Sequence, residues 1–213
     1  MKSPKPDHKF FERFLENDLD YLFNYLSDKQ KDLISGNIGN VPVEVLSKYT
    51  EINGPSTQLG QYYNIFDFDS QEINNLKDAL ESATKEACEY YGINYEEKNY
   101  HVNGWFNLDF KSSENKNEGV SPLVHESSYH DHMGGEGAPT FHGYYCVNAE
   151  PSITFYKINR GEQVFENINK NNRAILSETG HPHGRDDWYE EKPRITIAYD
   201  IAPGKVFDTW IKL

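Results

Sequence analysis

From Tyr100 onward the chain consists of short runs rich in β-branched and aromatic residues, and Gly, Asn and Pro separate these runs. Alternation of apolar and polar residues over such short runs is typical of strands that turn one face toward a core. Runs of this kind cover residues 100–110, 121–132, 140–148, 152–158, 173–178 and 194–201. The polar segment between the first two runs, residues 111–119, is interpreted as a hairpin loop. So many short strands in one half of a chain predict a sandwich or a barrel.

The first hundred residues favour helices instead. Apolar residues recur at helical spacing over residues 8–34, which predicts an amphipathic helix or a helix pair there: Phe11, Leu15, Leu19, Leu22 and Leu26. A second helix is expected after an Asp/Ser cap at residues 69–70, ending at Gly92. Its apolar face comprises Ile73, Leu76, Leu80, Ala83 and Ala87. The stretch between the two, residues 36–69, is interrupted by Gly, Asn and Pro and is assigned no regular structure.

A length of 213 residues suits one domain. We therefore expect a single domain over residues 1–213, with a helical flank and support at 1–99 and a β core at 100–207. The apolar fraction is only 37%, but 12 Phe, 15 Tyr and 3 Trp can fill a core. The predicted class is α+β, mainly β.

The distribution of charge and the absence of long apolar runs argue against several classes of partner and location. The net charge is −13, and the acidic residues are spread over both halves of the chain. Nucleic acid and anionic membrane surfaces require clustered Lys and Arg, so neither is an expected partner. No apolar run is long enough to cross a bilayer, and the start MKSPKPDHKFFERF shows no signal peptide. With two cysteines, Cys88 and Cys146, a disulfide framework is not expected, and a cytoplasmic location is the simplest prediction.

Histidine is concentrated in the β-rich half, where seven of the eight residues lie between His101 and His183. His130 and His132 flank Asp131, and in an extended strand both imidazoles point to one side while Asp131 faces away. A second His-x-His pair, His181 and His183, follows another apolar run. Two neighbouring strands at a barrel mouth would bring three imidazoles to one metal ion and leave other positions open. Such a site suits Fe(II), Zn(II) or a related metal.

A single His-x-His pair is more often a pair of surface or core histidines, because short motifs have a high false-positive rate. Two pairs, each at a turn, favour the metal site. His101, His125 and His142 have no such partner, and we interpret them as structural residues or pocket walls.

Arg194 opens the last long run. It shares one face of the expected strand with Thr196 and Ala198, and the apolar residues between them form the other face. A guanidinium at the start of a face of small side chains can bind a carboxylate through two parallel hydrogen bonds. The alternative is an edge-strand arginine paired with one of the nearby acids, Asp186, Asp187, Glu190 or Glu191.

Large aromatics and two polar loops are candidates for a substrate pocket. Trp105, Tyr145 and Trp188 can wall a pocket or pack in the core, and core packing is the commoner role of such residues. The loops at residues 112–119 and 184–192 flank the expected barrel mouth and are possible substrate lids.

In residues 71–203 the pattern resembles the 2-oxoglutarate/Fe(II)-dependent oxygenases, whose fold is a double-stranded β-helix of jelly-roll or cupin-like type. The stretch HDHMGGEGAPTFHGYYCVN is similar to the segment of prolyl-hydroxylase-like members in which a ligand pair precedes a tyrosine-rich strand. The stretch LKDALESATKEACEYYGINYEEKNYHVNGWFNLDF is similar to the helix and Trp-x-Asn strand of small oxygenases of bacteria and cyanophages. In a phage-encoded protein the compartment would be the host cytoplasm. The first 70 residues have no counterpart in this resemblance.

The resemblance implies a role for residues at matching positions. His130 becomes the first metal ligand, His132 occupies the position usually held by an acid, and His183 is the distal ligand. His181 and Asp131 are the alternative ligands. Arg194 and Thr196 correspond to the pair that binds the distal carboxylate of 2-oxoglutarate. The remaining cofactor-binding candidates are Tyr144, Cys146, Trp105 and Asn107, of which the first two would line the cosubstrate pocket.

The implied activity is hydroxylation of a small molecule or a peptide, for example a prolyl or other amino-acid residue. It would use Fe(II), O2 and 2-oxoglutarate, with ascorbate as a possible reductant. Two other classes stay open: a zinc hydrolase or lyase built on three histidines, and a non-catalytic jelly-roll binding module. The sequence predicts neither the substrate nor the oligomeric state.

Overall fold

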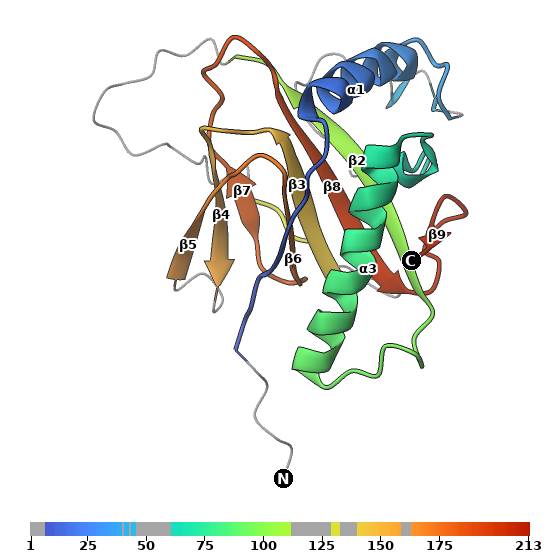
Figure 1. The fold of residues 1–213 in the computed structure, drawn as a ribbon, viewed down its shortest axis with the longest axis vertical. Coiled ribbons are helices and arrows are strands. Elements are labelled where there is room, and N and C mark those ends of the chain that lie inside the picture. Colours follow the sequence, from blue (N-terminus) through green and yellow to red (C-terminus); the bar gives the residue numbers. More distant parts are fainter. Residues whose placement is uncertain are drawn as a thin grey trace.

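The computed structural model has an α+β fold that is mostly β, with antiparallel sheets and two α-helices among the described residues (Figure 1). It describes residues 7–39, 41, 42, 44, 45, 61–111, 129–132, 140–158 and 163–213. The helices are α1 (Leu19–Ile34), the short 3-10 helix η2 (Ile65–Asp67) and α3 (Gln71–Tyr91). The strands are β1 (Phe11–Phe14), β2 (Tyr100–Asp109), β3 (Phe141–Asn148), β4 (Ile153–Ile158), β5 (Gln163–Ile168), β6 (Arg173–Glu178), β7 (His183–Arg185), β8 (Arg194–Pro203) and β9 (Ile211–Lys212). Within these ranges no helix has the length and apolar character needed to cross a membrane.

The strands form two antiparallel sheets. The large sheet has the order β1-β6-β3-β8-β2-β9, and the small sheet has the order β5-β4-β7. His130 pairs with His183 in an isolated antiparallel bridge and so extends the small sheet beyond β7. Between β3 and β8 the chain passes repeatedly from one sheet to the other, because β3, β6 and β8 are in the large sheet whereas β4, β5 and β7 are in the small one.

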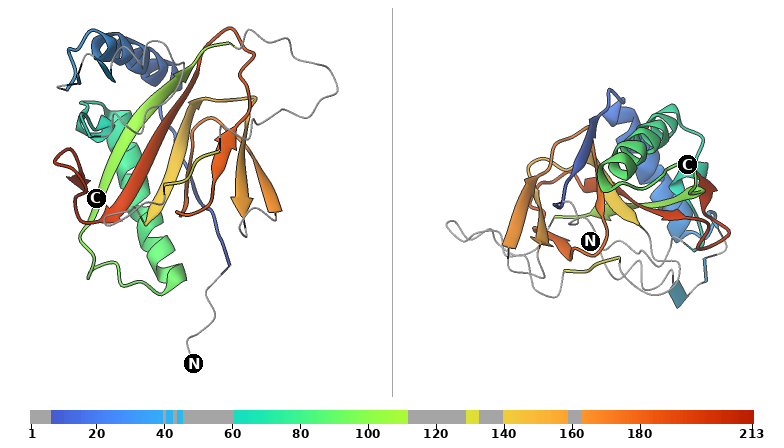
Figure 2. Two further views of the ribbon diagram at one scale, coloured as in Figure 1. Left: turned by 180° about the vertical axis from the view of Figure 1, so that it is seen from behind. Right: turned by 90° about the horizontal axis from the view of Figure 1, so that it is seen from below.

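The large sheet is the middle layer of the molecule. Figure 2 shows α1 and α3 on one of its faces and the small sheet on the other. The main core fills the space between the helices and the sheet, where Leu22, Leu76 and Ile197 are fully buried. A smaller core lies between the two sheets and contains Tyr144, Cys146, Ala149, Tyr156 and Ile175. This smaller core is the part of the interior that borders the candidate site.

The structure confirms the second predicted helix. It runs from Gln71 to Tyr91, after the N-cap Ser70, and ends at Gly92, whose φ of 67° is a left-handed conformation that glycine adopts without strain. All five apolar residues of the predicted face are buried. Five of the six predicted strands correspond to β2, β3, β4, β6 and β8.

The predicted helix over residues 8–34 is wrong in its first part. Phe11–Phe14 forms β1, which pairs with β6 in the register Phe11↔Leu176, and α1 begins only at Leu19. Asp18 separates the two elements: its carboxylate accepts the backbone N–H of Tyr21 at 3.0 Å and caps the helix. The open edge of β6 supplies hydrogen-bond partners that helical periodicity cannot reveal.

The remaining differences concern short elements. The strands β5, β7 and β9 were not predicted, and the stretch 36–69 contains η2. Of the remaining predicted strand, residues 121–132, only 129–132 are described. The predicted hairpin loop, residues 111–119, falls outside the described residues from 112 onward.

Candidate metal site

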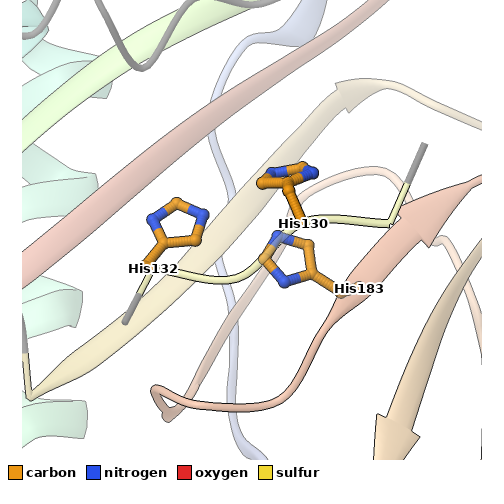
Figure 3. A group of neighbouring side chains, drawn as sticks. All are labelled: His130, His132 and His183. Carbon is orange, nitrogen blue, oxygen red and sulfur yellow. The ribbon is translucent and has the colours of Figure 1, made fainter. Parts of the chain in front are cut away.

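The backbone itself brings two of the three predicted ligands together. The N–H of His130 donates to the carbonyl of His183 at 3.0 Å, and the N–H of His183 donates to the carbonyl of His130 at 2.8 Å. Directly paired residues on antiparallel strands project their side chains to the same side. His132 lies two residues further along and returns to that side. The expected arrangement of neighbouring strands is therefore present, as Figure 3 shows.

The three imidazoles are close enough to share one ion. One ring nitrogen from each of His130, His132 and His183 lies within 4.8 Å of the other two. Ring centroids are 4.4 Å apart for His130 and His183 and 5.2 Å apart for His132 and His183. His130 is exposed and the other two are half-buried, so the group borders solvent on the side of His130. Three nitrogen donors with an open side fit a divalent metal of the Fe(II) or Zn(II) type.

Burial favours the neutral form of His183 and of the neighbouring His142. It holds the pKa of His183 well below its ordinary value, and the imidazoles of His130 and His132 lower this pKa further. His142 is fully buried, and its pKa is lowered by burial and by the neighbouring imidazoles. A neutral imidazole is the form that binds a metal ion.

His142 borders the group without belonging to it. Its ring stacks on those of His183 and His132 at 4.6 and 5.0 Å, and its Nε2 lies 3.1 Å from the hydroxyl of Ser177. This placement agrees with the prediction of a structural or pocket-wall residue. His101 is also buried, with Nδ1 2.8 Å from the carbonyl of Asn99, and His125 lies outside the described residues.

The alternative ligands lie elsewhere. The ring of His181 packs against that of His8 at 4.1 Å, and Asp131 is exposed; neither is part of the three-histidine group. One acid near the group was not predicted. Oδ1 of Asp200 lies 2.7 Å from Nδ1 of His132. A sequence signal did exist, because Asp200 continues the alternating face of Arg194, Thr196 and Ala198.

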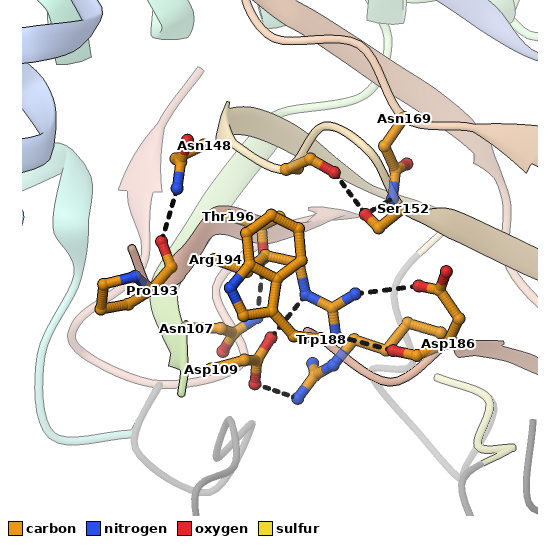
Figure 4. Close-up of polar contacts among 12 residues, drawn as sticks. Asn107, Asp109, Asn148, Ser152, Asn169, Asp186, Trp188, Pro193, Arg194 and Thr196 are labelled. Atoms are coloured by element: carbon orange, nitrogen blue, oxygen red, sulfur yellow. Dashed lines mark hydrogen bonds and ion pairs between the residues drawn. The ribbon is translucent and has the colours of Figure 1, made fainter. Parts of the chain in front are cut away.

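Arg194 is buried at the other end of β8, and its guanidinium is engaged by two acids (Figure 4). Nε donates to Asp109 at 2.9 Å, while the two terminal nitrogens donate to the carboxylate and the carbonyl of Asp186 at 3.1 and 3.0 Å. Asp186 was among the acids of the alternative reading, and Asp109 was not. That alternative also placed Arg194 on an edge strand, which is wrong, because β8 lies between β3 and β2.

A second arginine shares this cluster. Arg185 of β7 also donates to Asp109, so two arginines and two aspartates balance one another in charge. Burial raises the pKa of Asp186 and lowers that of Arg185. The three bonds described above use three of the five N–H groups of Arg194. Trp188 lies over the guanidinium, with the central carbon 5.6 Å from the ring centroid.

The other predicted site residues surround the space between the sheets. Thr196 accepts from the amide of Asn107 at 3.4 Å, across paired strands. Tyr144 and Cys146 belong to the small core, and the hydroxyl of Tyr144 donates to Asn169 at 2.8 Å. Trp105 is stacked 6.0 Å from His132.

Two of the aromatic residues considered as pocket walls are packed in the interior instead. Tyr145 is fully buried on the helix side of the sheet, where its hydroxyl accepts from Asn17 at 3.2 Å. Trp188 is 3% exposed and donates to the carbonyl of Lys192 at 2.8 Å. The segment 184–192 therefore packs around Arg194, which does not support a lid over the histidines. The other predicted lid, residues 112–119, lies outside the described residues.

Comparison with known proteins adds no family assignment. No family model matches the chain, and no curated protein matches it. The chemistry of the site therefore follows from its geometry: three imidazole nitrogen donors close enough to share one ion, and a separate cluster of two arginines and two aspartates.

Proposed function

We propose that this chain is an Fe(II)- and 2-oxoglutarate-dependent dioxygenase that hydroxylates a small molecule or a peptide, with prolyl and other amino-acid side chains as the first substrates to test. The observation that carries the proposal is the grouping of the His130, His132 and His183 side chains, of which the first and third are aligned by a backbone bridge. Three protein ligands leave room on a six-coordinate ion for a chelating cosubstrate and oxygen.

The strand order supports a double-stranded β-helix. In this interpretation the large-sheet strands β6-β3-β8-β2 face the small-sheet strands β5-β4-β7 and the segment around His130. The alternation of the chain between sheets is the pattern of a two-sheet jelly roll. In such an arrangement the histidines lie at one end of the interior and Arg194 at the other.

The residues have separate roles in this proposal. The three histidines hold the metal, and Tyr144 and Cys146 line the pocket of the cosubstrate. Bound Fe(II) and 2-oxoglutarate supply the oxidising chemistry, in which 2-oxoglutarate is decarboxylated to succinate as O2 hydroxylates the substrate. The buried small core excludes water from the inner side of the site.

Arg194 is the proposed partner of the distal carboxylate, with Thr196 beside it. Because Asp109 and Asp186 already accept from this guanidinium, the carboxylate would have to use its remaining N–H groups or displace one acid. Arg173, at the start of β6, has a second buried guanidinium. Its Nε makes no hydrogen bond to any described residue. Arg173 is therefore the alternative anion partner.

Because Arg194 already donates to Asp109 and Asp186, a second candidate is favoured, a three-histidine zinc hydrolase or lyase. This activity needs no dicarboxylate cosubstrate, so the arginine–aspartate cluster would be purely structural. A site of three imidazoles also suits Zn(II), which binds three protein ligands and a water in many catalytic sites.

Anaerobic titration of the metal-free protein with Fe(II) and 2-oxoglutarate tests both candidates. The oxygenase proposal predicts a weak visible charge-transfer band that fades when oxygen is admitted. The Arg194→Lys variant should need more 2-oxoglutarate for the same band, with unchanged iron binding, and Arg173→Lys serves as the matched comparison. Tight zinc binding without a band would support the hydrolase. Absence of metal binding would exclude both enzymes and leave the binding module.

A further inference from the structure

Asp200 is a half-buried acid that contacts the three-histidine group. It lies on β8, in register with Asn103 of β2 and His142 of β3, and its neighbours Tyr199 and Ile201 are in the main core. Oδ1 is 2.7 Å from Nδ1 of His132, and the side chains of His132 and Asp200 are 7% and 15% exposed. The carboxylate therefore reaches His132 from β8 of the large sheet.

Burial makes this contact costly unless it is compensated. Oδ1 of Asp200 is shielded from solvent and, in this orientation, makes no well-aligned hydrogen bond to a described residue. Within the described part of the chain, His132 is the basic side chain that contacts this carboxylate. A buried carboxylate requires a donor and a nearby positive charge. The Nδ1–H of His132 can provide the donor, and a metal ion on the same ring would provide the charge.

We propose that Asp200 is the outer-shell carboxylate of the metal site, accepting the Nδ1–H of His132 and thereby directing Nε2 of that ring to the metal. This inference rests on the three-histidine site of the proposed function. Metal-bound histidines commonly donate their other ring N–H to a carboxylate, which fixes the tautomer and raises ligand basicity. Asp200 would also give the site the negative charge that a carboxylate would have provided in place of one of the three histidine ligands.

Asp200 is a positioning residue in this proposal, not a ligand. The group of donor atoms within 4.8 Å of one another contains the three histidines and does not include Asp200 among the residues searched. Its contact is with Nδ1 of His132, at 2.7 Å.

Zinc affinity measured against a chromophoric chelator provides the first test. We expect Asp200→Ala to weaken zinc binding about 10- to 100-fold, the usual effect of losing such a partner. Asp200→Asn keeps the size and an acceptor oxygen but loses the charge, so its loss should be smaller. Asp131→Asn is the matched control, because it removes an exposed acid adjacent in sequence to both ligands. Its affinity should stay within about threefold of the wild type, since exposed charges are screened.

Histidine nitrogen NMR of the zinc-loaded protein provides a readout that a merely structural role would not change. The wild type should show His132 protonated at Nδ1, with a slowly exchanging proton that is lost in Asp200→Ala and kept in Asp200→Asn. Protonation of His132 at Nε2, or equal zinc affinity for all four proteins, would overturn the proposal. So would an equal loss in Asp131→Asn, which would indicate a long-range charge effect.

The two proposals fail in different ways. If the wild type binds no metal, the three-histidine site is wrong, and this inference is lost with the proposed function. If the wild type shows the Fe(II)–2-oxoglutarate band while both Asp200 variants bind zinc as tightly as it does, only the role of Asp200 is rejected. Circular dichroism of the metal-free variants separates unfolding from loss of metal, and Asp200→Asn keeps the test valid if Asp200→Ala does not fold.

Discussion

At the scale of single residues, the two histidines of the His-Pro-His segment differ although they are only two positions apart. In an extended strand they would point to the same side. The strand β7 begins only at His183, however, and the segment before it turns at Gly180, whose φ is 93°. His181 therefore packs on His8, and His183 is aligned with His130 by the backbone bridge.

We predict that His183→Ala weakens metal binding by more than about 100-fold. It removes one of three ligands, and even an outer-shell partner contributes about 10- to 100-fold. His181→Ala should change affinity less than about threefold, since its ring contacts His8. Zinc competition titrations of the two variants compare them directly. Equal losses in both would contradict the assignment of the distal ligand.

At the scale of elements, the central strands of the large sheet approach too closely for a side chain at one position. Gly143 of β3 is in register with Tyr199 of β8. The hydroxyl of Tyr199 lies 3.1 Å from the carbonyl oxygen of Tyr144 and 2.8 Å from that of Ile175. A Cβ at Gly143 would lie 1.8 Å from the carbonyl oxygen of Ile175 and 2.8 Å from the ring of Tyr199.

Gly143→Ala should therefore lower the free energy of unfolding by at least about 2 kcal/mol, because β3 must move away from the Ile175 carbonyl of β6 and the ring of Tyr199 must also shift. Gly92→Ala is the comparison: its added Cβ meets nothing within 4 Å, and only its positive φ is unfavourable, at a cost of about 1–2 kcal/mol. Urea unfolding of both variants measures the difference. A loss for Gly143→Ala no larger than that for Gly92→Ala would show that the sheet adapts.

At the scale of the whole molecule, the interior is unusually rich in phenol and thiol groups that must stay protonated. Burial raises the pKa of Cys146 to about 12 from a reference of 9.0. It raises the pKa values of five buried tyrosines above their reference of 10.0: Tyr100, Tyr144, Tyr145, Tyr156 and Tyr199. In the unfolded chain these groups would ionise near their reference values.

Stability should consequently be insensitive to these groups below about pH 9 and fall as the pH rises from there toward the folded-state pKa values. The unfolded state releases protons that the folded state retains, and each group contributes about 1.4 kcal/mol per pH unit in that window. Urea midpoints measured between pH 7 and 11, with tyrosinate absorbance recorded in parallel, check this. Normal titration of all tyrosines in the folded protein would contradict it.

Local sequence patterns were sufficient for the long elements. The helix α3 follows from helical spacing, because it buries one face of its own sequence. The strands β2, β3, β6 and β8 are buried along nearly their whole length, and runs of β-branched and aromatic residues between turn residues identified them. The two His-x-His pairs also contained all three members of the histidine group. Strand geometry accounts for His130 and His132, whereas the choice of His183 over His181 followed from the family resemblance.

Contacts between distant parts of the chain decided the rest. The edge of β6 makes a strand of Phe11–Phe14, where helical spacing predicted a helix. Asp109, which pairs with Arg194 across two neighbouring strands, and Asp200, which reaches His132, come together only when the sheets form. Hydrogen bonding and charge compensation depend on distance in space, and a sequence pattern records only distance along the chain.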